Sequence, residues 1–233
     1  MSNDQINSQN KLQSKFSLFI KDTLQTVATA LVMTFIIYNF ISKPNQVRGE
    51  SMEPNIKPRD FILTNQMKDI LIKTGIGNNL NLNYDRGDIV ILRIPGEEPY
   101  IKRIVAGPGD IIEIRNSHLI VNNKVLIEKY LTSNVITTPG DFLREGEAKE
   151  VPGDNYFVMG DNRTRSLDSR YMKVGFVPKQ YIIGPASLRI WPFEKFGFLA
   201  SGEYNEIPVN EYDFENDDSI EIDMFENIQE QIK

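Results

Sequence analysis

The chain has 233 residues, of which 40% are apolar, and its formal net charge is −6. This length can bury one sizeable hydrophobic core or two small ones. An acidic chain without a basic stripe argues against nucleic acid as the main partner. The absence of Cys excludes disulfides and thiolate chemistry but does not decide the cellular compartment.

The N-terminal part predicts a membrane anchor. Residues 1–22 are polar, and the nineteen residues 23–41 contain no charged side chain. As a helix, this run is about 28 Å long, close to the hydrocarbon thickness of a bilayer. A cleaved signal peptide is disfavoured, because the small residues Ala28-Thr29-Ala30 lie inside the apolar run and not after it. We therefore predict a cytoplasmic segment over 1–22 and a transmembrane helix over 23–41, with basic residues only weakly favouring this orientation.

After Pro44 the pattern changes to short runs rich in Ile and Val, separated by turn residues. Frequent short strands without alternating helices predict an antiparallel β fold, and no amphipathic helix stands out beyond residue 43. We place turns at 107–110, 122–123 and 152–154. The expected strands are 61–64, 88–94, 100–105, 111–114, 119–121, 156–159 and 181–190.

The C-terminal end is strongly acidic. From Glu203 to Lys233 there are eleven Asp or Glu and one Lys. Such a composition is typical of a solvated segment. We therefore predict a β-rich domain over 42–200, followed by an acidic, disordered tail over 201–233.

Ser51 and Lys102 are the candidate nucleophile and base. Ser51 lies in Gly-Glu-Ser-Met-Glu-Pro, ten residues after Ile41, and Lys102 lies in Tyr-Ile-Lys-Arg-Ile-Val. A serine hydroxyl needs a nearby base, and lysine serves only when neutral, which requires a pKa well below its usual ~10.4. Burial lowers the pKa of a lysine, and aliphatic neighbours such as Ile101 and Ile104 favour a dry environment. Taken alone, each residue also fits an ordinary turn serine or a solvated strand lysine.

A third segment, residues 160–170, combines hydroxyls, carboxylates and guanidinium groups in one short loop. Two nearby carboxylates, Asp161 and Asp168, could form an acid–base pair. The neighbouring arginines favour the ionised form of both carboxylates, which suits a structural role better. We therefore interpret Asp161, Asp168 and Arg170 as an ion-pair network that holds the loop.

In this order and spacing, the three blocks resemble the bacterial type I signal peptidases, a family of membrane-bound serine proteases with a Ser-Lys dyad. The resemblance extends from the apolar run to about Pro192. It implies coiled antiparallel β-sheets in a two-part catalytic domain, with Ser51 as nucleophile, Lys102 as general base and Ser166 as a hydrogen-bond partner that orients the lysine amine. Gly49 stands where some members carry a serine that helps to bind the oxyanion, so the Ser51 backbone N–H is the donor that remains.

The resemblance also implies the substrate and its mode of binding. Preproteins with small residues at P1 and P3 are expected to bind as an extended strand along exposed backbone edges, before the nucleophile and before the base. We expect Gly49, Met52, Tyr100 and Ile101 to contact this strand. No metal or other cofactor is implied, a monomer is expected, and membrane lipid is the other partner. Because Ser51 follows Ile41 so closely, the nucleophile stays within at most about 36 Å of the end of the apolar run.

Three other interpretations remain open. A Ser-His-Asp triad would have to use His118, the only histidine, which lies in a hairpin-like stretch. A related Ser-Lys membrane protease could process a few dedicated substrates. A membrane-anchored β domain could bind partners without catalysis, although such a module has no reason to keep Ser51, Lys102 and Ser166.

Overall fold

The computed structural model describes residues 3–36, 42–74, 83–132 and 135–214. The chain divides into two compact units, residues 1–43 and 44–233, and each is described by itself.

The first unit is one helix, α1 (Asn3–Ile36). Its residues Leu18–Phe35 are long and apolar enough to cross a membrane, with a mean hydropathy of 1.2 and no residue buried within the structure. Its threonines are compatible with lipid, because the hydroxyls of Thr23, Thr26 and Thr29 each donate 2.8 Å hydrogen bonds to the carbonyl four residues earlier. The predicted span 23–41 therefore begins within α1, and its last residues, 37–41, lie outside the described residues.

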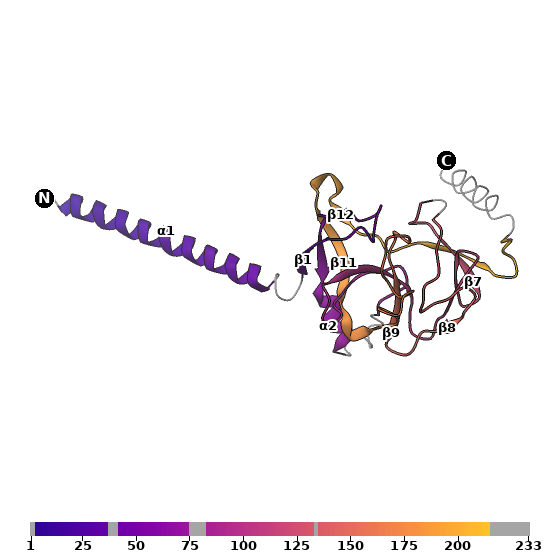
Figure 1. Ribbon diagram of the computed structural model, residues 1–233. Helices are drawn as coiled ribbons and strands as arrows, with labels where there is room; N and C mark the ends of the chain where they lie inside the picture. The colour runs from indigo at the N-terminus through magenta and orange to yellow at the C-terminus, as the bar shows by residue number, and fades with distance from the viewer. Residues whose placement is uncertain (1–2, 37–41, 75–82, 133–134, 215–233) are drawn as a thin grey trace. The chain divides into compact units, whose positions relative to one another are not determined.

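The second unit consists mainly of two antiparallel sheets, which confirms the mostly β prediction (Figure 1). The larger sheet has the order β1-β2-β11-β3-β4-β9-β10, with β12 pairing β11. Its strands are β1 (Ser42–Gln46), β2 (Phe61–Asn65), β3 (Ile89–Leu92), β4 (Tyr100–Ala106), β9 (Asn155–Met159), β10 (Val177–Pro178), β11 (Ile182–Trp191) and β12 (Gly197–Phe198). Two short 3₁₀ turns, η2 (Lys179–Tyr181) and η3 (Phe193–Lys195), flank β11.

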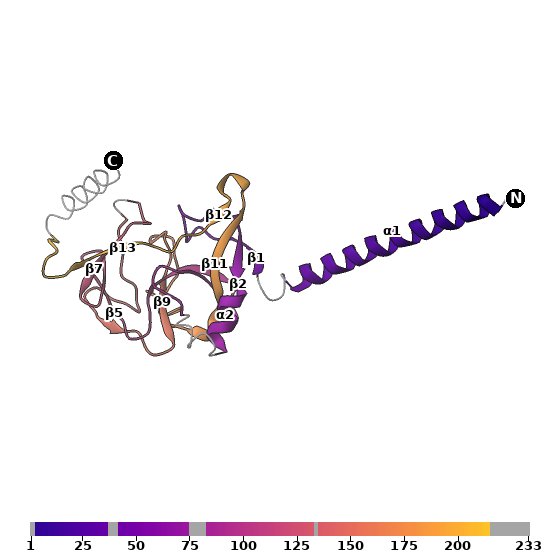
Figure 2. The ribbon, with the colours of Figure 1, turned by 180° about the vertical axis from the view of Figure 1, so that it is seen from behind.

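The smaller sheet has the order β13-β7-β6-β5-β8, and β5, β7 and β13 are best seen from behind (Figure 2). Its strands are β5 (Ile111–Arg115), β6 (His118–Val121), β7 (Lys124–Glu128), β8 (Lys149–Glu150) and β13 (Tyr204–Pro208). The predicted turn at Asn122-Asn123 joins β6 to β7. Both residues have positive φ, 53° and 63°, which Asn tolerates and which two-residue hairpins require.

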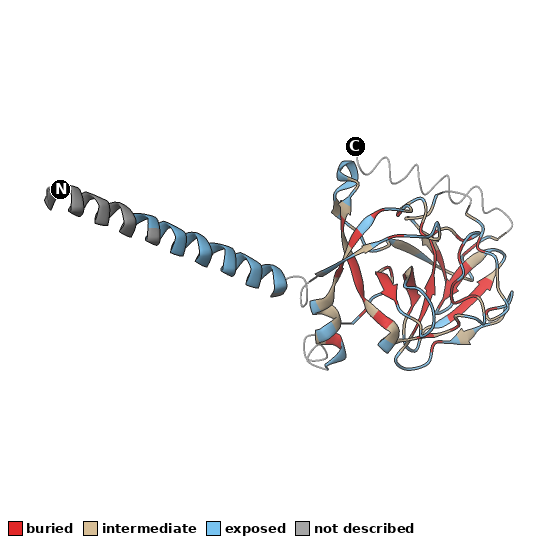
Figure 3. Cartoon of the chain, turned by 60° about the vertical axis from the view of Figure 1, so that its left-hand side comes forward, coloured by how far each residue is buried: buried red, intermediate tan, exposed pale blue. Residues whose placement is uncertain are grey.

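Strand β4 contributes side chains to two hydrophobic cores, one on each of its faces. Along β4, Ile104 packs in the core of the larger sheet, whereas Val105 packs in a second core built with residues of the smaller sheet. Because side chains alternate along a strand, Lys102 shares the face of Ile104, and Arg103 shares the face of Val105. Buried residues gather on the strands of this unit, as Figure 3 shows.

One helix was missed by the sequence analysis. Residues Gln66–Lys73 form α2, an eight-residue helix that is too short to stand out as a repeat of apolar positions and that buries Ile72 in the core of the larger sheet. Part of its stability comes from contacts that a sequence does not display. The Asn65 side chain caps the helix by accepting from Lys68 N at 3.1 Å, and the Lys68 amine donates to Asp88 at 2.9 Å.

The acidic end of the chain departs from its prediction. Strand β13 pairs with β7 from Tyr204 to Pro208. Beyond it, Tyr212 is only 6% exposed and packs with Ile120 and Val125. The predicted disorder from residue 201 is therefore wrong for residues 204–212, because apolar and aromatic side chains among the acids find a sheet edge to cover. Residues 215–233 lie outside the described residues.

We expect a chain that ends at Gly202 to unfold at lower urea concentration than the full chain. Loss of one large buried aromatic side chain such as Tyr212 costs about 3–5 kcal/mol, and the truncation also removes the ladder between β13 and β7. A chain that ends at Phe214 keeps these contacts and serves as the control. Circular dichroism during urea denaturation measures the effect, and equal midpoints for the two truncated chains would contradict it.

Candidate active site

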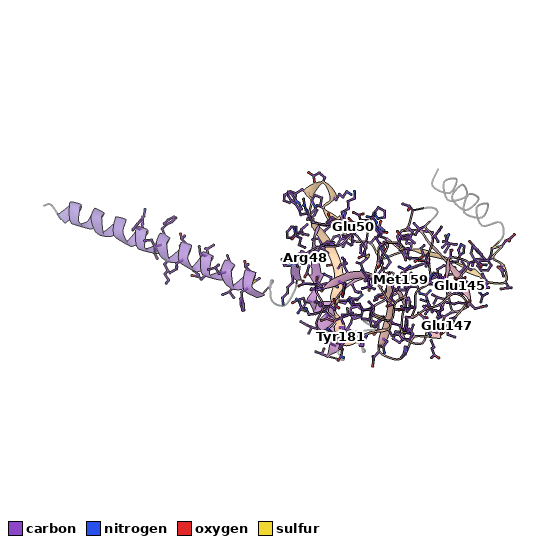
Figure 4. All side chains as sticks on the ribbon, viewed as in Figure 1. Arg48, Glu50, Glu145, Glu147, Met159 and Tyr181 are labelled. Carbon is purple, nitrogen blue, oxygen red and sulfur yellow. The ribbon has the colours of Figure 1, made fainter. Side chains whose placement is uncertain are left out.

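Ser51 lies at the start of a tight turn whose next residues are anchored in the core. Met52 and Ile56 are both fully buried, and Ile56 N donates to Met52 O at 2.8 Å. They pack with Val47 and Ile62 in one cluster. Met52, which we expected to contact substrate, is therefore an internal anchor of the turn. Figure 4 labels Arg48 and Glu50, the sequence neighbours of Gly49, just before Ser51.

Lys102 reaches Ser51 from strand β4. Its Nζ lies 2.6 Å from Ser51 Oγ and donates to the carbonyl of Ile101 at 3.1 Å. The structure therefore brings together two residues that are 51 positions apart in the sequence.

Burial weakens the charge of Lys102. The residue is only 4% exposed, and this desolvation lowers the pKa of Lys102 to about 8. The carboxylates of Asp168 and Asp161 act against the change by favouring the ammonium, and the Arg170 guanidinium adds to it. A large fraction of the amine is thus neutral at mildly alkaline pH.

A second loop holds the backbone of the Ser51 turn. Asn162 N donates to Ser51 O at 3.0 Å, and Asn162 Nδ2 donates to Glu50 O at 3.2 Å. Gly160 also lies against this turn, and a Cβ there would collide with Ser51 O and with the Ser166 hydroxyl. The close approach explains glycine at position 160.

Two buried ion pairs stabilise this loop. Asp168 and Arg170 are both fully buried and pair at 2.8 Å, and Asp168 also accepts from Gly160 N at 3.0 Å. Burial raises the pKa of the Asp168 carboxyl, but the bonds from Arg170 outweigh that effect and lower it overall. Asp161 instead forms a two-point pair with Arg103, at 2.9 and 2.8 Å.

The expected network of Asp161, Asp168 and Arg170 is thus two separate pairs. The sequence analysis missed Arg103, although its place next to Lys102 on an alternating strand could have suggested a buried partner. It also missed the pair between Arg163 and Glu128, at 2.5 Å with both side chains buried.

Ser166 does not make the hydrogen bond to the lysine amine that the resemblance implies. It is 7% exposed, and its Oγ has no hydrogen-bond partner of normal geometry among the described residues. The hydroxyl lies close enough to Asp168 to help lower the pKa of that carboxyl. It also lies beside Gly160, on the loop that holds Ser51.

A groove of about 280 Å³ leads to the two residues. It is lined by two backbone segments, residues 44–49 and residues 98–102, and by Ile62 and Ile91. Tyr100 and Ile101, two of the expected substrate contacts, line this groove together with Gly49. The ladder between β4 and β9 begins only at Arg103, so the preceding residues face the groove with a backbone edge.

His118 is held elsewhere. It lies on β6 of the smaller sheet, where its Nε2 is 3.0 Å from the Tyr212 hydroxyl and its Nδ1 is 2.7 Å from Asn116 O. These contacts use both ring nitrogens, so His118 anchors the segment around Tyr212 and does not pair with Ser51. Among the described residues, no group of three or more His, Asp or Glu side chains could hold a metal ion.

Comparisons with known proteins agree on one family. The model of the family described as signal peptidase, peptidase S26, matches residues 20–191. Signal peptidase IB of Staphylococcus aureus (strain MRSA252) is 33% identical over 196 residues, covering 79% of this chain and 93% of its own. Signal peptidase I P of Bacillus subtilis subsp. natto is 37% identical over 186 residues, covering 76% and 91%. A crystal structure of a signal peptidase I from Enterococcus faecalis V583 is 30% identical, with a TM-score of 0.38, and covers 45% of this chain and 97% of its own.

Proposed function

We propose that Ser51 is the nucleophile and neutral Lys102 the general base of the proteolysis that this chain carries out. The chain belongs to the signal peptidase family, peptidase S26. Membership of this family makes the protein a serine endopeptidase that cleaves signal peptides from exported proteins. The assignment of roles to individual side chains is our proposal.

The observation that carries this proposal is the 2.6 Å contact between Lys102 Nζ and the half-buried Ser51 Oγ, in which the lysine itself is only 4% exposed. A base must be within hydrogen-bond distance of the proton that it removes. It must also be unprotonated, and burial supplies that condition by lowering the pKa of Lys102. His118 is not the base, because both of its ring nitrogens are engaged with Tyr212 and Asn116.

Acylation follows from this geometry. Neutral Lys102 accepts the hydroxyl proton as Ser51 Oγ attacks the carbonyl carbon of the scissile bond. The negative charge that develops on the carbonyl oxygen is stabilised by the backbone N–H of Ser51. The Lys102 ammonium then gives its proton to the leaving nitrogen, the peptide bond breaks, and the mature protein departs with a free amine.

Deacylation repeats the same steps with water. Neutral Lys102 takes a proton from a water molecule as it attacks the acyl-enzyme. The ester bond to Ser51 Oγ then breaks, the serine recovers a proton from the lysine, and the signal peptide departs with a new C-terminal carboxyl group, which restores the starting state. One amine therefore acts as base and acid in both halves of the reaction.

The substrate lies in the groove as an added strand. One edge is the backbone before Ser51, residues 45–49, and the other is the backbone before Lys102, residues 99–101. Main-chain hydrogen bonds of this kind give affinity without demanding a particular sequence, which suits an enzyme with many preproteins. The small residues at P1 and P3 are the specificity that the family leads us to propose.

The anchor determines where the reaction takes place. The apolar helix α1 and the family together indicate a membrane-anchored protein. We infer a single span with the catalytic unit on the outer face. Exposed aromatic side chains between the end of β11 and β12 support a place beside lipid headgroups, because such side chains favour the membrane interface. They are Trp191, Phe193, Phe196 and Phe198, and the first two rings contact each other.

We expect Ser51→Ala and Lys102→Met each to lower cleavage of a preprotein at least about 10³-fold, since each variant removes one partner of the proton transfer. Both variants should remain folded by circular dichroism. Gly153→Ala, at an exposed position where a Cβ meets nothing within 4 Å, is the control and should keep wild-type turnover per folded molecule. Substantial turnover by purified Ser51→Ala or Lys102→Met would rule out the proposed roles.

Turnover at saturating substrate should rise with pH and level off above about 8. Below the lowered pKa of Lys102 the amine is protonated and cannot accept the serine proton, so the rate should fall about tenfold for each pH unit. Initial rates between pH 6 and 10 measure this profile. A midpoint near the unperturbed lysine value of about 10.4 would show that the amine is not desolvated in the working enzyme.

If the catalytic unit lies on the outer face, protease added to intact spheroplasts should degrade it without lysis. A cytoplasmic protein of the same cells is the control and should survive until the cells are opened. Immunoblotting with an antibody to residues 44–214 follows the fate of the unit. Protection in sealed spheroplasts, with digestion only after lysis, would refute the proposed orientation.

A further inference from the structure

The residues that follow the family match form a continuous strap over the catalytic unit. The family model ends at residue 191, and we call residues 197–214 the C-terminal strap. The strap begins beside β11, where Leu199 N donates to Ser187 O at 2.9 Å. It then crosses to the smaller sheet as β13 and reaches Tyr212 and Phe214, whose rings lie beside His118 (Figures 1 and 2). It therefore spans both sheets.

The first part of the strap touches the core under the nucleophile. Leu199 packs against the cluster that contains Met52 and Ile56, the two anchors of the Ser51 turn. Next to it, Ser201 Oγ donates to Asp88 Oδ1 at 2.8 Å. The strap thus contacts the support of the nucleophile before it reaches the smaller sheet.

The middle of the strap packs against the side chain of Arg103. Gly202 N donates to Gly87 O at 2.9 Å, and the same carbonyl accepts from Arg103 Nη1 at 2.8 Å. The ring of Tyr130 lies 3.9 Å from the Arg103 guanidinium carbon. Tyr204 of β13 contacts that ring edge-on, with centroids 5.4 Å apart. The Arg103 side chain is therefore held between Tyr130 and the strap.

Arg103 is the link between the two proposed catalytic residues. It follows Lys102 in β4, and its partner Asp161 precedes Asn162, which binds the carbonyl of Ser51. Any displacement of the Arg103 guanidinium moves Asp161, and with it the loop that holds the Ser51 turn. A shift of about 1 Å between reacting groups can reduce a rate about a hundredfold.

We propose that the C-terminal strap is a positioning element of the catalytic site, in which Gly202 and Tyr204 hold Arg103 against Asp161 and so keep Ser51 within reach of Lys102. This inference rests on the proposed function of the two residues. It gives the segment outside the family match a role in turnover as well as in stability.

Gly202 offers a sharp test, because its position leaves no room for a side chain. A Cβ at this position lies 2.6 Å from Tyr130 Cε1 and 3.2 Å from Arg103 Cδ, so Gly202→Ala displaces the ring or the arginine. Gly197→Ala is the matched control. It lies in the same strap, and its Cβ meets nothing within 4 Å.

We expect kcat per folded molecule of the full-length Gly202→Ala chain to fall about tenfold to a hundredfold, with KM changed less than about twofold. Gly197→Ala should match the wild type in both constants. A merely stabilising strap lowers the folded fraction, measured by circular dichroism, and leaves kcat per folded molecule unchanged. Wild-type kcat in folded Gly202→Ala would therefore overturn the proposal.

Tyr204→Phe keeps the assay decisive if Gly202→Ala does not fold. This variant retains the ring and removes the hydroxyl that lies 3.3 Å from the Tyr130 hydroxyl, and its kcat should fall at least about threefold. An unchanged kcat would count against the strap. Ser51→Ala in the same assay tests the dyad separately, and cleavage by that variant would refute the proposed function. Normal kcat in Gly202→Ala and Tyr204→Phe would refute only the role of the strap.

Discussion

The site depends on keeping one lysine dry among several charges. Lys102 is almost fully buried, yet two carboxylates near it favour its protonated form. Each carboxylate has its own arginine, Asp161 with Arg103 and Asp168 with Arg170. A paired carboxylate attracts an ammonium less than a free one. Buried carboxylates can therefore hold the loop beside Ser51 without raising the pKa of Lys102 back to its usual value.

The same ion pairs explain how the site is assembled from distant segments. Strand β4 has two faces: Lys102 lines the groove, whereas its neighbour Arg103 points to the opposite face and pairs with Asp161. The pair between Arg103 and Asp161 carries the position of β4 to the loop, and Asn162 carries it to the Ser51 turn. Breaking a buried pair by removing one partner leaves an uncompensated charge at a cost of about 3–5 kcal/mol. The arrangement is therefore rigid where the proton transfer needs rigidity.

Much of the fold was predictable because local patterns decide it. The Ile- and Val-rich runs are strands, and Asn122-Asn123 is a turn, since few residues tolerate its backbone angles. Helix α2 was missed because it is only eight residues long, and the cap and the salt bridge to Asp88 that help to stabilise it leave no repeat in the sequence. The ordered strap was missed for a related reason. Its acidic composition is visible in the sequence, whereas the sheet edge that Tyr204 and Tyr212 cover is not.

The sequence was enough to predict the proposed chemistry, because a serine and a lysine stand in motifs of one protease family and an apolar run precedes them. It could do so because nucleophile, base and anchor are properties of residue types in short segments. Which side chains contact one another is visible only in the tertiary structure. Asp161 pairs with Arg103, Met52 is an internal anchor, and His118 binds Tyr212. These contacts depend on which elements pack against one another. The sequence shows which residues share one face of a strand, but it does not show which residues lie opposite that face.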